Sequence, residues 1–384
     1  MSGSRAVPLS LIVNTYQKPR HLELVLESIA AQVGVAGAFE VIVTDDGSLD
    51  DTPEVVSAFA ARVDFPVRFT TQPHNGFRLA AIRNAGARRA TGEMLLFLDG
   101  DCILPCDHLA AFLACRQPGV ALLGYCARLP EATSQSLVPG TLGGIDLPAL
   151  APAGQRRALA HRRLKAWWYT LLQHPSKPRL AGGNFAVWQS DFRRVNGFDE
   201  RFRGWGQEDD DLGLRLRASG VRLESILHRT SSLHVWHPSD PSATLRWRDG
   251  ANVKYFERRG RLTSCRQGLE QRSASAILWG LPADLPATQW GAMLDEALAG
   301  VPRAAPEARC EIDIVLRPGT GEFRRRAECR LLLCDAPPEG SAAGRGPADL
   351  LRLRRQADRV VTLGATSPPA RAAALLREIL AGAG

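Results

Sequence analysis

The segment EMLLFLDGD, residues 93–101, decides the fold, because five consecutive apolar residues are followed at once by two carboxylates. A short, continuously apolar run bounded in this way predicts a strand that is buried on both faces of a sheet. Side chains two residues apart point to the same side of a strand, so Asp99 and Asp101 can face one ion or ligand. Asp-Gly is also typical of a solvated turn, so the pattern needs support from the rest of the chain.

Three more apolar runs precede this strand, and amphipathic segments separate them. Strands are expected at residues 9–13, 39–47 and 67–71, with helices at 19–32, from 52 onward and at 79–90. This alternation predicts an α/β fold with a mostly parallel sheet covered by helices on both faces. Ligands bind at the carboxyl ends of the strands in such sheets. The polar residues at these strand ends are Asn14 to Tyr16, Asp45 to Ser48 and Asp99 to Asp101.

Length and composition allow one large domain and a smaller one in the 384 residues. The 45% hydrophobic and 23% charged residues are ordinary for a globular protein, and no apolar run approaches the roughly 18 residues of a membrane span. The first apolar stretch is too short for a signal peptide, so we expect a cytoplasmic protein.

Of the eight cysteines, Cys102, Cys106 and Cys115 lie close together in the sequence. No second cysteine pair accompanies them, so they fit reduced thiols better than a structural zinc site.

The domain organisation follows from a change of pattern near residue 262. Before it we expect a basic helix at residues 156–173, a strand at 182–188 and a helix at 242–259. After it we expect strands at 310–316, 327–335 and 358–364 and a helix at 369–380. We predict a domain at 1–262 (donor half 7–128, acceptor half 156–262), a linker at 263–287 and a small α/β domain of unknown role at 288–384.

Several residues after the early strands suit a nucleotide and its phosphates. The carboxylates of Asp45 and Asp46 can accept hydrogen bonds from a base imide or from ribose hydroxyls, and Gly47 lets the backbone come close. Arg78 and Arg83 lie near a helix start, where guanidinium groups can clamp phosphate. The alternatives are a simple turn for the acids and two solvated arginines.

A metal site is suggested by LHVWHP, residues 233–238, with His234 and His237 three apart. Imidazole binds manganese-like ions, and a histidine can complete a site begun by the Asp99–Asp101 acids. A structural histidine pair is the alternative. The presence of the acid motif in the same chain favours the metal site.

The acidic run in RGWGQEDDDLGLRL, residues 203–216, has two interpretations. Acids stabilise the first turn of a helix by interacting with its dipole. One of the carboxylates can instead be a catalytic base.

Four stretches recur in a fixed order: SLIVNTYQKPRHLELVLESI (10–29), VIVTDDGSLDDT (41–52), NGFRLAAIRNAGARRATGEMLLFLDGDC (75–102) and GGNFAVWQSDFRRVNGFDERFRGWGQEDDDLGLRL (182–216). In this order they resemble the motifs of family 2 glycosyltransferases with the GT-A fold. The later portion is similar to the galactosyltransferase C-terminal segment shared by β-1,4-galactosyltransferases and chondroitin-polymerase-type enzymes. The resemblance covers about residues 7–260. One departure is Gln207, which stands where the family motif Gly-Trp-Gly-Gly-Glu-Asp has a glycine.

The resemblance implies a role for each matching residue. Asp209 corresponds to the general base of inverting transferases, Glu208 would orient the acceptor sugar, and Trp205 would lie against its apolar face. Asp210 and Asp211 are interpreted as acids at the helix N-terminus that interact with the helix dipole. The implied donor-binding residues are Thr15, Tyr16, Asp45, Asp46, Gly47, Arg78, Arg83, Asp99 and Gly100. Gly183 and Asn184 would join Trp205 and Glu208 at the acceptor, and Asp101, His237 and His234 would bind Mn²⁺ or Mg²⁺.

The sequence therefore predicts a metal-dependent inverting glycosyltransferase that moves a sugar from a nucleotide-sugar, most plausibly a UDP-sugar, to a hydroxyl of a glycan or glycolipid acceptor. A retaining transferase of the same fold and a non-catalytic nucleotide-sugar-binding protein are the alternatives. The basic helix at 156–173 would border the acceptor site or touch the inner face of the cell membrane. No nucleic-acid motif accompanies it, so no nucleic-acid partner is expected.

Overall fold

The computed structural model describes residues 7–238 except 175, residues 250–258 and 263–272, isolated positions beyond these, and the segments 279–280, 298–300, 310–317, 327–335 and 359–363. Contacts divide the chain into two compact units, Met1–Val253 and Lys254–Gly384. None of the described helices is both long and apolar enough to cross a membrane. The predicted domain limits at 262 and 288 stay predictions. One short strand, β11 (Trp279–Gly280), lies inside the segment expected to be a linker.

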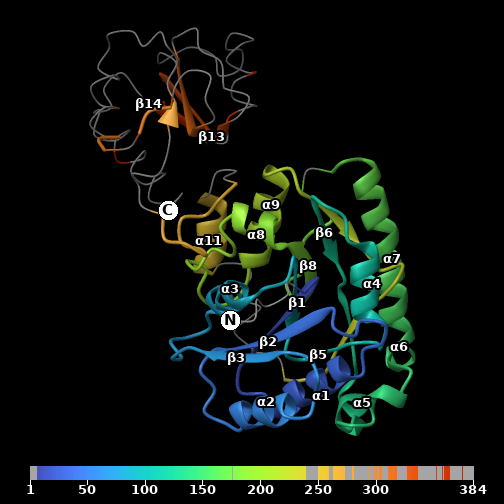
Figure 1. The fold of residues 1–384 in the computed structure, drawn as a ribbon. Helices are drawn as coiled ribbons and strands as arrows, with labels where there is room; N and C mark the ends of the chain where they lie inside the picture. Colours follow the sequence, from blue (N-terminus) through green and yellow to red (C-terminus); the bar gives the residue numbers. More distant parts are fainter. Residues whose placement is uncertain are drawn as a thin grey trace. The chain divides into compact units, whose positions relative to one another are not determined.

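The first unit contains a seven-stranded sheet in the order β3-β2-β1-β4-β8-β6-β9 (Figure 1). Its strands are β1 Leu9–Thr15, β2 Phe39–Asp45, β3 Val67–Thr71, β4 Met94–Asp99, β6 Val120–Leu123, β8 Asn184–Trp188 and β9 Arg222–Ser225. All neighbours pair in parallel except β8, which runs antiparallel to both β4 and β6. The predicted α/β fold with a mostly parallel sheet is confirmed.

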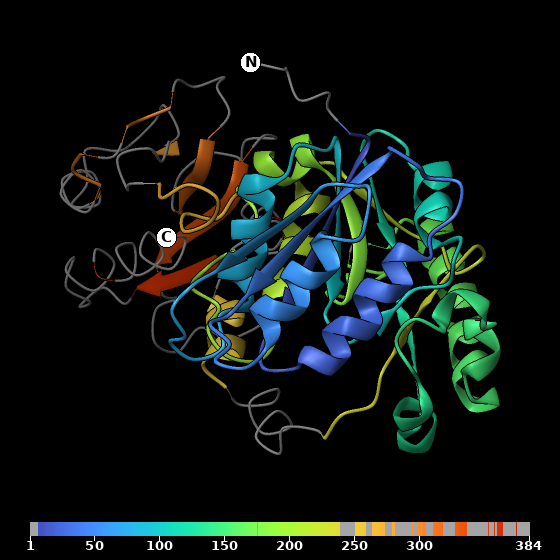
Figure 2. The ribbon, with the colours of Figure 1, turned by 60° about the horizontal axis from the view of Figure 1, so that its bottom comes forward.

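Helices cover both faces of this sheet. Helices α1 (Pro19–Ala30) and α2 (Thr52–Ala60) lie on one face, and α3 (Leu79–Arg89), α8 (Gln189–Arg194) and α9 (Glu208–Ala218) on the other (Figures 1 and 2). Alternation along each strand explains the two layers: Leu9, Leu11 and Val13 join one buried cluster with the apolar residues of α1, including Leu22 and Ile29. The helices exclude water from both faces of the strands.

On the other face, Phe97 of β4 is the centre of an aromatic cluster. Its ring lies 4.9 Å from Phe185, 5.2 Å from Phe192 and 5.4 Å from Phe198, measured between ring centroids. This packing attaches β8, α8 and the loop before α9 to the early strands. It fixes the second half of the unit against the first.

A small second sheet in the order β5-β10-β7 lies beside the carboxyl end of β4. Its strands are β5 Cys102–Ile103, β7 Cys126–Arg128 and β10 Ser232–His234. In the antiparallel pairing of β5 with β10, His234 is opposite Cys102. The histidine motif is thus placed next to the acid motif that ends β4.

The connection between β7 and β8 is helical: α5 Glu131–Ser136, η1 Leu142–Gly144, α6 Leu147–Leu150 and α7 Ala153–Leu171. The basic helix predicted at 156–173 is present as α7. Of the helix predicted at 242–259, the structure describes α11, Ala251–Arg258.

The second unit has a four-stranded sheet in the order β11-β12-β13-β14, with all neighbours parallel. The strands β12 Cys310–Arg317, β13 Ala327–Asp335 and β14 Arg359–Leu363 match the three predicted strands. The helix predicted at 369–380 lies outside the described residues. This unit therefore has an α/β type of sheet of its own.

Candidate active site

In the strand order, β1 lies between β2 and β4. The chain adds β2 and β3 on one side of β1 and then β4 on the other side, so the direction of strand addition reverses at β1. Crevices at such a reversal, at the carboxyl ends of the strands, are where open α/β sheets bind ligands. In register, Thr15 of β1 is level with Asp45 of β2, and Asn14 with Asp99 of β4. Thr15 is buried, and its hydroxyl has no hydrogen-bond partner among the described residues. An unpaired buried hydroxyl here is free to accept or donate to a ligand.

The carboxylate of Asp45 stabilises the turn that follows β2. It accepts hydrogen bonds from the backbone N–H of Gly47 and Ser48 at 3.1 and 2.9 Å and from the hydroxyls of Ser48 and Thr71 at 2.6 and 2.7 Å. Gly47 has φ of +84°, and a Cβ there would meet the backbone nitrogen of His74 at 2.5 Å. A nucleotide base that contacted Asp45, as predicted, would add a hydrogen bond to a carboxylate whose oxygens already accept hydrogen bonds within the protein.

Asp46 holds the loop that leads to α3. Its carboxylate accepts from the side-chain amide of Gln72 at 2.6 Å and from the backbone N–H of Arg78 at 3.0 Å. The ring of Tyr16 stacks on His74 with centroids 4.4 Å apart and planes inclined by 10°. The side chain of Arg78 donates to the carbonyl of Pro73. These contacts shape one wall of the crevice.

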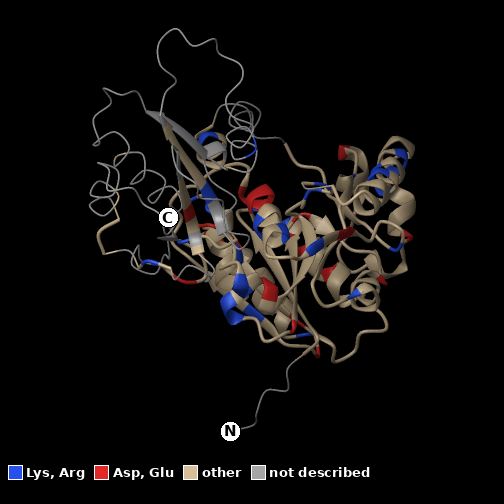
Figure 3. Ribbon diagram, turned by 90° about the horizontal axis from the view of Figure 1, so that it is seen from above, with Lys and Arg blue, Asp and Glu red and all other residues tan. Residues whose placement is uncertain are grey.

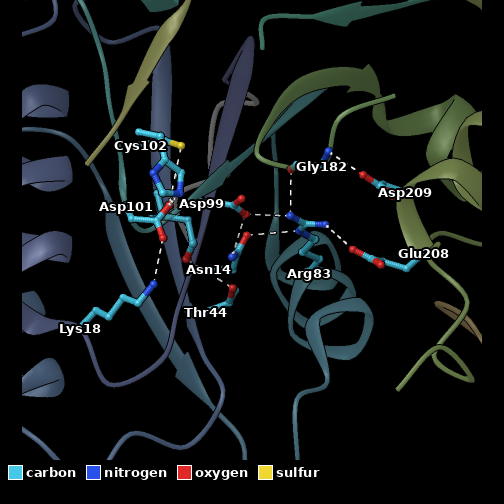
Figure 4. Close-up of polar contacts among 12 residues, drawn as sticks. Asn14, Lys18, Thr44, Arg83, Asp99, Asp101, Cys102, Gly182, Glu208 and Asp209 are labelled. Atoms are coloured by element: carbon cyan, nitrogen blue, oxygen red, sulfur yellow. Dashed lines mark hydrogen bonds and ion pairs between the residues drawn. The ribbon is translucent and has the colours of Figure 1, made fainter. Parts of the chain in front are cut away.

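Arg83 joins the acid motif of β4 to the acid run of α9 (Figure 4). Its Nη2 donates to Asp99 Oδ1 at 2.8 Å and to the carbonyl of Gly182 at 2.9 Å. Its Nη1 lies 3.6 Å from Glu208 Oε1, and Asp99 Oδ1 also accepts from Asn14 at 3.1 Å. The guanidinium is 1% exposed. The donor-phosphate contact of Arg83 stays a prediction; in this structure the guanidinium is buried and lies between two carboxylates.

Glu208 and Asp209 have electrostatic properties unlike ordinary surface acids. Burial, followed by the charge of Asp209, raises the pKa of Glu208 to about 8, against the opposing effect of Arg83. Burial also raises the pKa of Asp209, and Arg83 and a hydrogen bond from the backbone N–H of Gly182, at 3.1 Å, oppose this. A raised carboxyl pKa is what a general base near neutral pH needs. Glu208 Oε2 has no hydrogen-bond partner among the described residues, so it can accept one from a hydroxyl.

Asp210 and Asp211 differ from these two and from each other. Asp210 lies 3.2 Å from Arg179, and burial together with the charge of Asp209 raises its pKa to about 6. Asp211 forms a buried ion pair with Arg215 at 2.7 Å, and Arg215 donates to the carbonyls of Val195 and Gly197. The expectation that Asp211 only interacts with the helix dipole is wrong. Its carboxylate neutralises an arginine that holds the preceding loop.

The glycine pair before β8 lies directly against the Arg83 network. A Cβ at Gly182 would be 2.7 Å from Arg83 Nη1, and one at Gly183 would be 2.6 Å from Asp99 Oδ2. The carbonyl of Gly183 also accepts the backbone N–H of Asp99 at 3.1 Å. Only glycine leaves room for these contacts.

Asn184, the next residue, has an interior role. Its amide donates to the carbonyl of Tyr125 at 2.9 Å and to the hydroxyl of Ser232 at 3.0 Å, while its oxygen lies 3.3 Å from His108. The side chain is 1% exposed. The acceptor contact of Asn184 stays a prediction; in this structure its amide joins β8 to the small sheet.

The Gly-Trp-Gly turn presents an aromatic face. Trp205 is 39% exposed, and one side of its ring stacks on Phe77 with centroids 5.3 Å apart. Asn252 donates to the carbonyls of Trp205 and Gly206 at 3.1 and 3.0 Å. Gln207 has φ of +75°, the left-handed conformation that favours glycine. This chain thus keeps the backbone shape of the family motif despite the substitution.

Asp101, His234 and His237 form a cluster whose ligand atoms all lie within 4.8 Å of one another. His237 Nε2 is 3.2 Å from Asp101 Oδ2, and His234 Nε2 is 3.6 Å from Asp101 Oδ1. Burial alone would raise the pKa of Asp101, but the hydrogen bond from His237 and the charges of His234 and Lys18 hold it well below its usual range. A carboxylate and two imidazoles are a donor set that suits Mn²⁺-like ions.

Lys18 is a site residue that the sequence did not single out. Its ammonium lies 3.1 Å from Asp101 Oδ2, between the end of β1 and the start of α1 (Figure 4). A divalent cation on Asp101 would repel this ammonium, which is 34% exposed and free to turn toward an anionic ligand. The signal was available in TYQKP, since a cation after the first strand of the sheet faces the same edge as the acids.

Two segments of the chain match models of known protein families. Residues 10–114 match the model described as glycosyl transferase family 2, and residues 170–238 match the one described as N-terminal domain of galactosyltransferase. These segments of the first unit are therefore similar to glycosyl transferase family 2 and to galactosyltransferases. The resemblance inferred from the four sequence motifs is thereby confirmed.

Among relatives, validoxylamine A glucosyltransferase of Streptomyces hygroscopicus subsp. jinggangensis is 31% identical over 241 residues, or 56% of this chain and 52% of that protein. Chondroitin synthase of Escherichia coli is 26% identical over 232 residues, or 57% and 33%. The chain thus spans about half the length of the first relative and a third of the second. S. aureus TarS 1-349 in complex with UDP-GlcNAc matches with a TM-score of 0.46 at 19% identity, over 66% of this chain and 65% of that one.

Proposed function

We propose that this chain is a metal-dependent, inverting glycosyltransferase that uses a UDP-sugar donor and a hydroxyl of a glycan or glycolipid as acceptor. The observation that carries the proposal is the contact of one buried guanidinium, that of Arg83, with both Asp99 and Glu208. This contact joins the acids that end β4 to the acids that begin α9 in one site. A donor at the strand ends would then face a carboxylate base across a short distance.

The donor half of the proposal rests on the crevice formed by β1, β2 and β4. The free hydroxyl of Thr15, the Tyr16 ring and the loop held by Asp46 offer a hydroxyl, an aromatic face and backbone groups for a nucleoside. Lys18 supplies a positive charge near Asp101, where the diphosphate would lie. Bound by Asp101, His234 and His237, a divalent cation would supply Lewis-acid stabilisation to the departing diphosphate.

The acceptor half rests on α9 and the turn before it. The exposed side of the Trp205 ring suits the apolar face of a sugar, and the free oxygen of Glu208 suits one of its hydroxyls. Asp209 would take the proton from the attacking hydroxyl as its oxygen bonds to the anomeric carbon. The bond from that carbon to the phosphate oxygen breaks on the opposite side, which inverts the configuration and releases the nucleoside diphosphate.

Two measurements test this function. Titration with UDP-sugars and GDP-sugars, with and without Mn²⁺, is expected to give metal-dependent binding and slow hydrolysis of a UDP-sugar. With an acceptor identified, NMR of the first-formed product is expected to give the inverted anomer. A retained anomer would replace the inverting mechanism by a retaining one, and binding without any turnover would support the non-catalytic alternative.

A further inference from the structure

The helix α7 is almost entirely exposed. Of its 19 residues, all of which the structure describes, only Ala166 is buried. Its inner side contacts β7 and β9. Arg162 lies over the ring of Tyr125 at 4.7 Å, and Leu159 packs at the edge of the main core. In Figure 1 the helix runs along the side of the first unit that is far from α2 and α3. A surface helix normally buries an apolar stripe, so this exposure needs a reason.

The outward face of α7 is apolar in its second half. Leu164, Trp168 and Leu171 are spaced by four and three residues, which places them on one face of a helix. With their neighbours they form a patch of five exposed side chains, listed with their exposed fractions: Leu164 52%, Trp167 57%, Trp168 48%, Leu171 59% and Leu172 70%. Single exposed apolar residues are ordinary, but a contiguous group of this size marks an interaction surface.

Positive charges of α7 border this patch, and the acid Glu224 lies across the cavity that it lines together with Leu164 and Trp167. The sequence of α7 contains five Arg or Lys residues and no Asp or Glu. Arg157 lies seven residues, or two helical turns, before Leu164 and therefore on the same face of the helix. Arg163 and Lys165 flank the patch on its two sides. All three are exposed, and none forms an ion pair with any residue that the structure describes. In Figure 3, where Lys and Arg are blue, blue bands lie on the helices at the right of the view.

We propose that this face of α7, residues 157–172, docks on an anionic lipid surface. An interfacial helix places Leu and Trp side chains at the boundary between headgroups and acyl chains. Its Lys and Arg residues remain at the level of the headgroups, where each is attracted by anionic lipid. The patch and its cationic border match both requirements. A protein partner that covered this face would need acids opposite Arg163 and Lys165. Lys is also depleted in the centres of protein interfaces.

The test uses the full chain and vesicles, without substrate, so that its outcome is independent of the proposed transferase activity. Co-sedimentation is expected with vesicles of phosphatidylcholine mixed with phosphatidylglycerol and not with pure phosphatidylcholine vesicles. The apolar variant Trp168→Ser/Leu171→Ser and the charge variant Arg157→Gln/Arg163→Gln/Lys165→Gln are each expected to lower the partition coefficient at least tenfold. One charge contributes about fivefold near such a surface.

Matched control variants carry the same changes elsewhere on the described surface. Val33→Ser/Leu49→Ser removes two exposed apolar side chains, and Arg89→Gln/Arg116→Gln/Arg193→Gln removes three exposed charges. Both are expected to bind vesicles as the unmodified chain does. Equal binding to both kinds of vesicle, or equal losses in test and control variants, would overturn the proposal. So would self-association in sedimentation velocity that Trp168→Ser/Leu171→Ser abolishes, because the face would then contact a second copy of the chain.

Discussion

Arg83 Nη1 lies 3.6 Å from Glu208 Oε1, while Nη2 of the same guanidinium donates to Asp99 Oδ1 at 2.8 Å. One buried cation thus lies between the end of β4 and the start of α9, which are more than a hundred residues apart in the sequence. The positive charge opposes the rise in pKa that burial causes at both Glu208 and Asp209. Arg83 therefore influences the protonation of these two carboxylates.

Replacing Arg83 by glutamine is expected to shift the pH dependence of activity. Loss of the positive charge raises the pKa of Asp209 further, and a base must be deprotonated to accept a proton. The acid limb of the kcat/KM profile should therefore move to higher pH, with activity at neutral pH reduced. Arg88→Gln, on the same helix but exposed and paired with Glu200, should leave the acid limb in place. An unshifted limb in Arg83→Gln would contradict the assignment of Arg83.

Replacing Asp209 by asparagine keeps the size of the side chain and removes its ability to take up a proton. We expect turnover to fall by about 10²–10⁴-fold, the usual effect of losing a general base. The affinity for a UDP-sugar, measured by calorimetry, should hardly change. Asp210→Asn, one residue along and paired with exposed Arg179, should stay within a few-fold of the unmodified chain. Loss of donor binding in Asp209→Asn would place the carboxylate in the donor site instead.

Replacing Asp211 by asparagine should affect stability and leave the chemistry alone. It removes the carboxylate charge that pairs at 2.7 Å with the Arg215 guanidinium, which is 2% exposed. Removing one member of a buried pair costs about 3–5 kcal/mol, and we expect the lower end because asparagine keeps a hydrogen bond. Denaturant unfolding measures this loss. Glu224→Gln, in the exposed pair with Arg222, should cost about 0–1 kcal/mol.

If Asp211→Asn unfolds at the same denaturant concentration as the unmodified chain, the Asp211–Arg215 pair does not hold the loop. Turnover per folded molecule should be unchanged in both variants. A selective loss of turnover in Asp211→Asn would instead bring this acid into the catalytic site.

Replacing Gly183 by alanine should disable the site through a single methyl group. The new Cβ would lie 2.6 Å from Asp99 Oδ2, closer than real Cβ contacts come, so Asp99 must move away from Arg83. We expect at least a tenfold loss of both donor affinity and turnover. Gly154→Ala, a glycine of α7 with nothing within 4 Å of the added Cβ, is the control and should stabilise the helix by about 0.5–1 kcal/mol. Normal donor binding in Gly183→Ala would show that Asp99 does not contact the donor.

The metal site can be tested by binding alone. Asp101→Asn and His237→Ala are each expected to weaken Mn²⁺ binding at least tenfold, as measured by electron paramagnetic resonance titration, because each removes one ligand atom of the cluster. His21→Ala is the control, since the His21 ring lies 6.1 Å from that of His237 and its Nε2 is bonded to the carbonyl of Trp236 at 3.1 Å. Unchanged Mn²⁺ affinity in both ligand variants would place the ion elsewhere.

The sequence by itself determined the layers of the first unit and the edge on which ligands bind. Each buried strand is a short continuous apolar run, and each helix is a local periodic pattern, so both are set by residues that are neighbours in the chain. The residues after β1, β2 and β4 had to meet at one edge, because parallel strands all end on the same side. The Asp99–Asp101 motif and the acid run at 208–211 are also formed by neighbours in the chain, so both could be recognised from the sequence.

Only the tertiary structure decided what each of those side chains does. Arg83 and Arg78 are alike in sequence, but α3 turns the first inward to Asp99 and Glu208 and leaves the second at the loop. Asp209 and Asp211 stand two apart on one helix, yet Asp211 pairs with the buried Arg215 while Asp209 accepts a hydrogen bond from the backbone N–H of Gly182. His234 lies beside Asp101 only because β10 pairs with β5. Burial and ionic partners come from segments far away in the sequence, and these set the pKa and the available hydrogen bonds of a side chain.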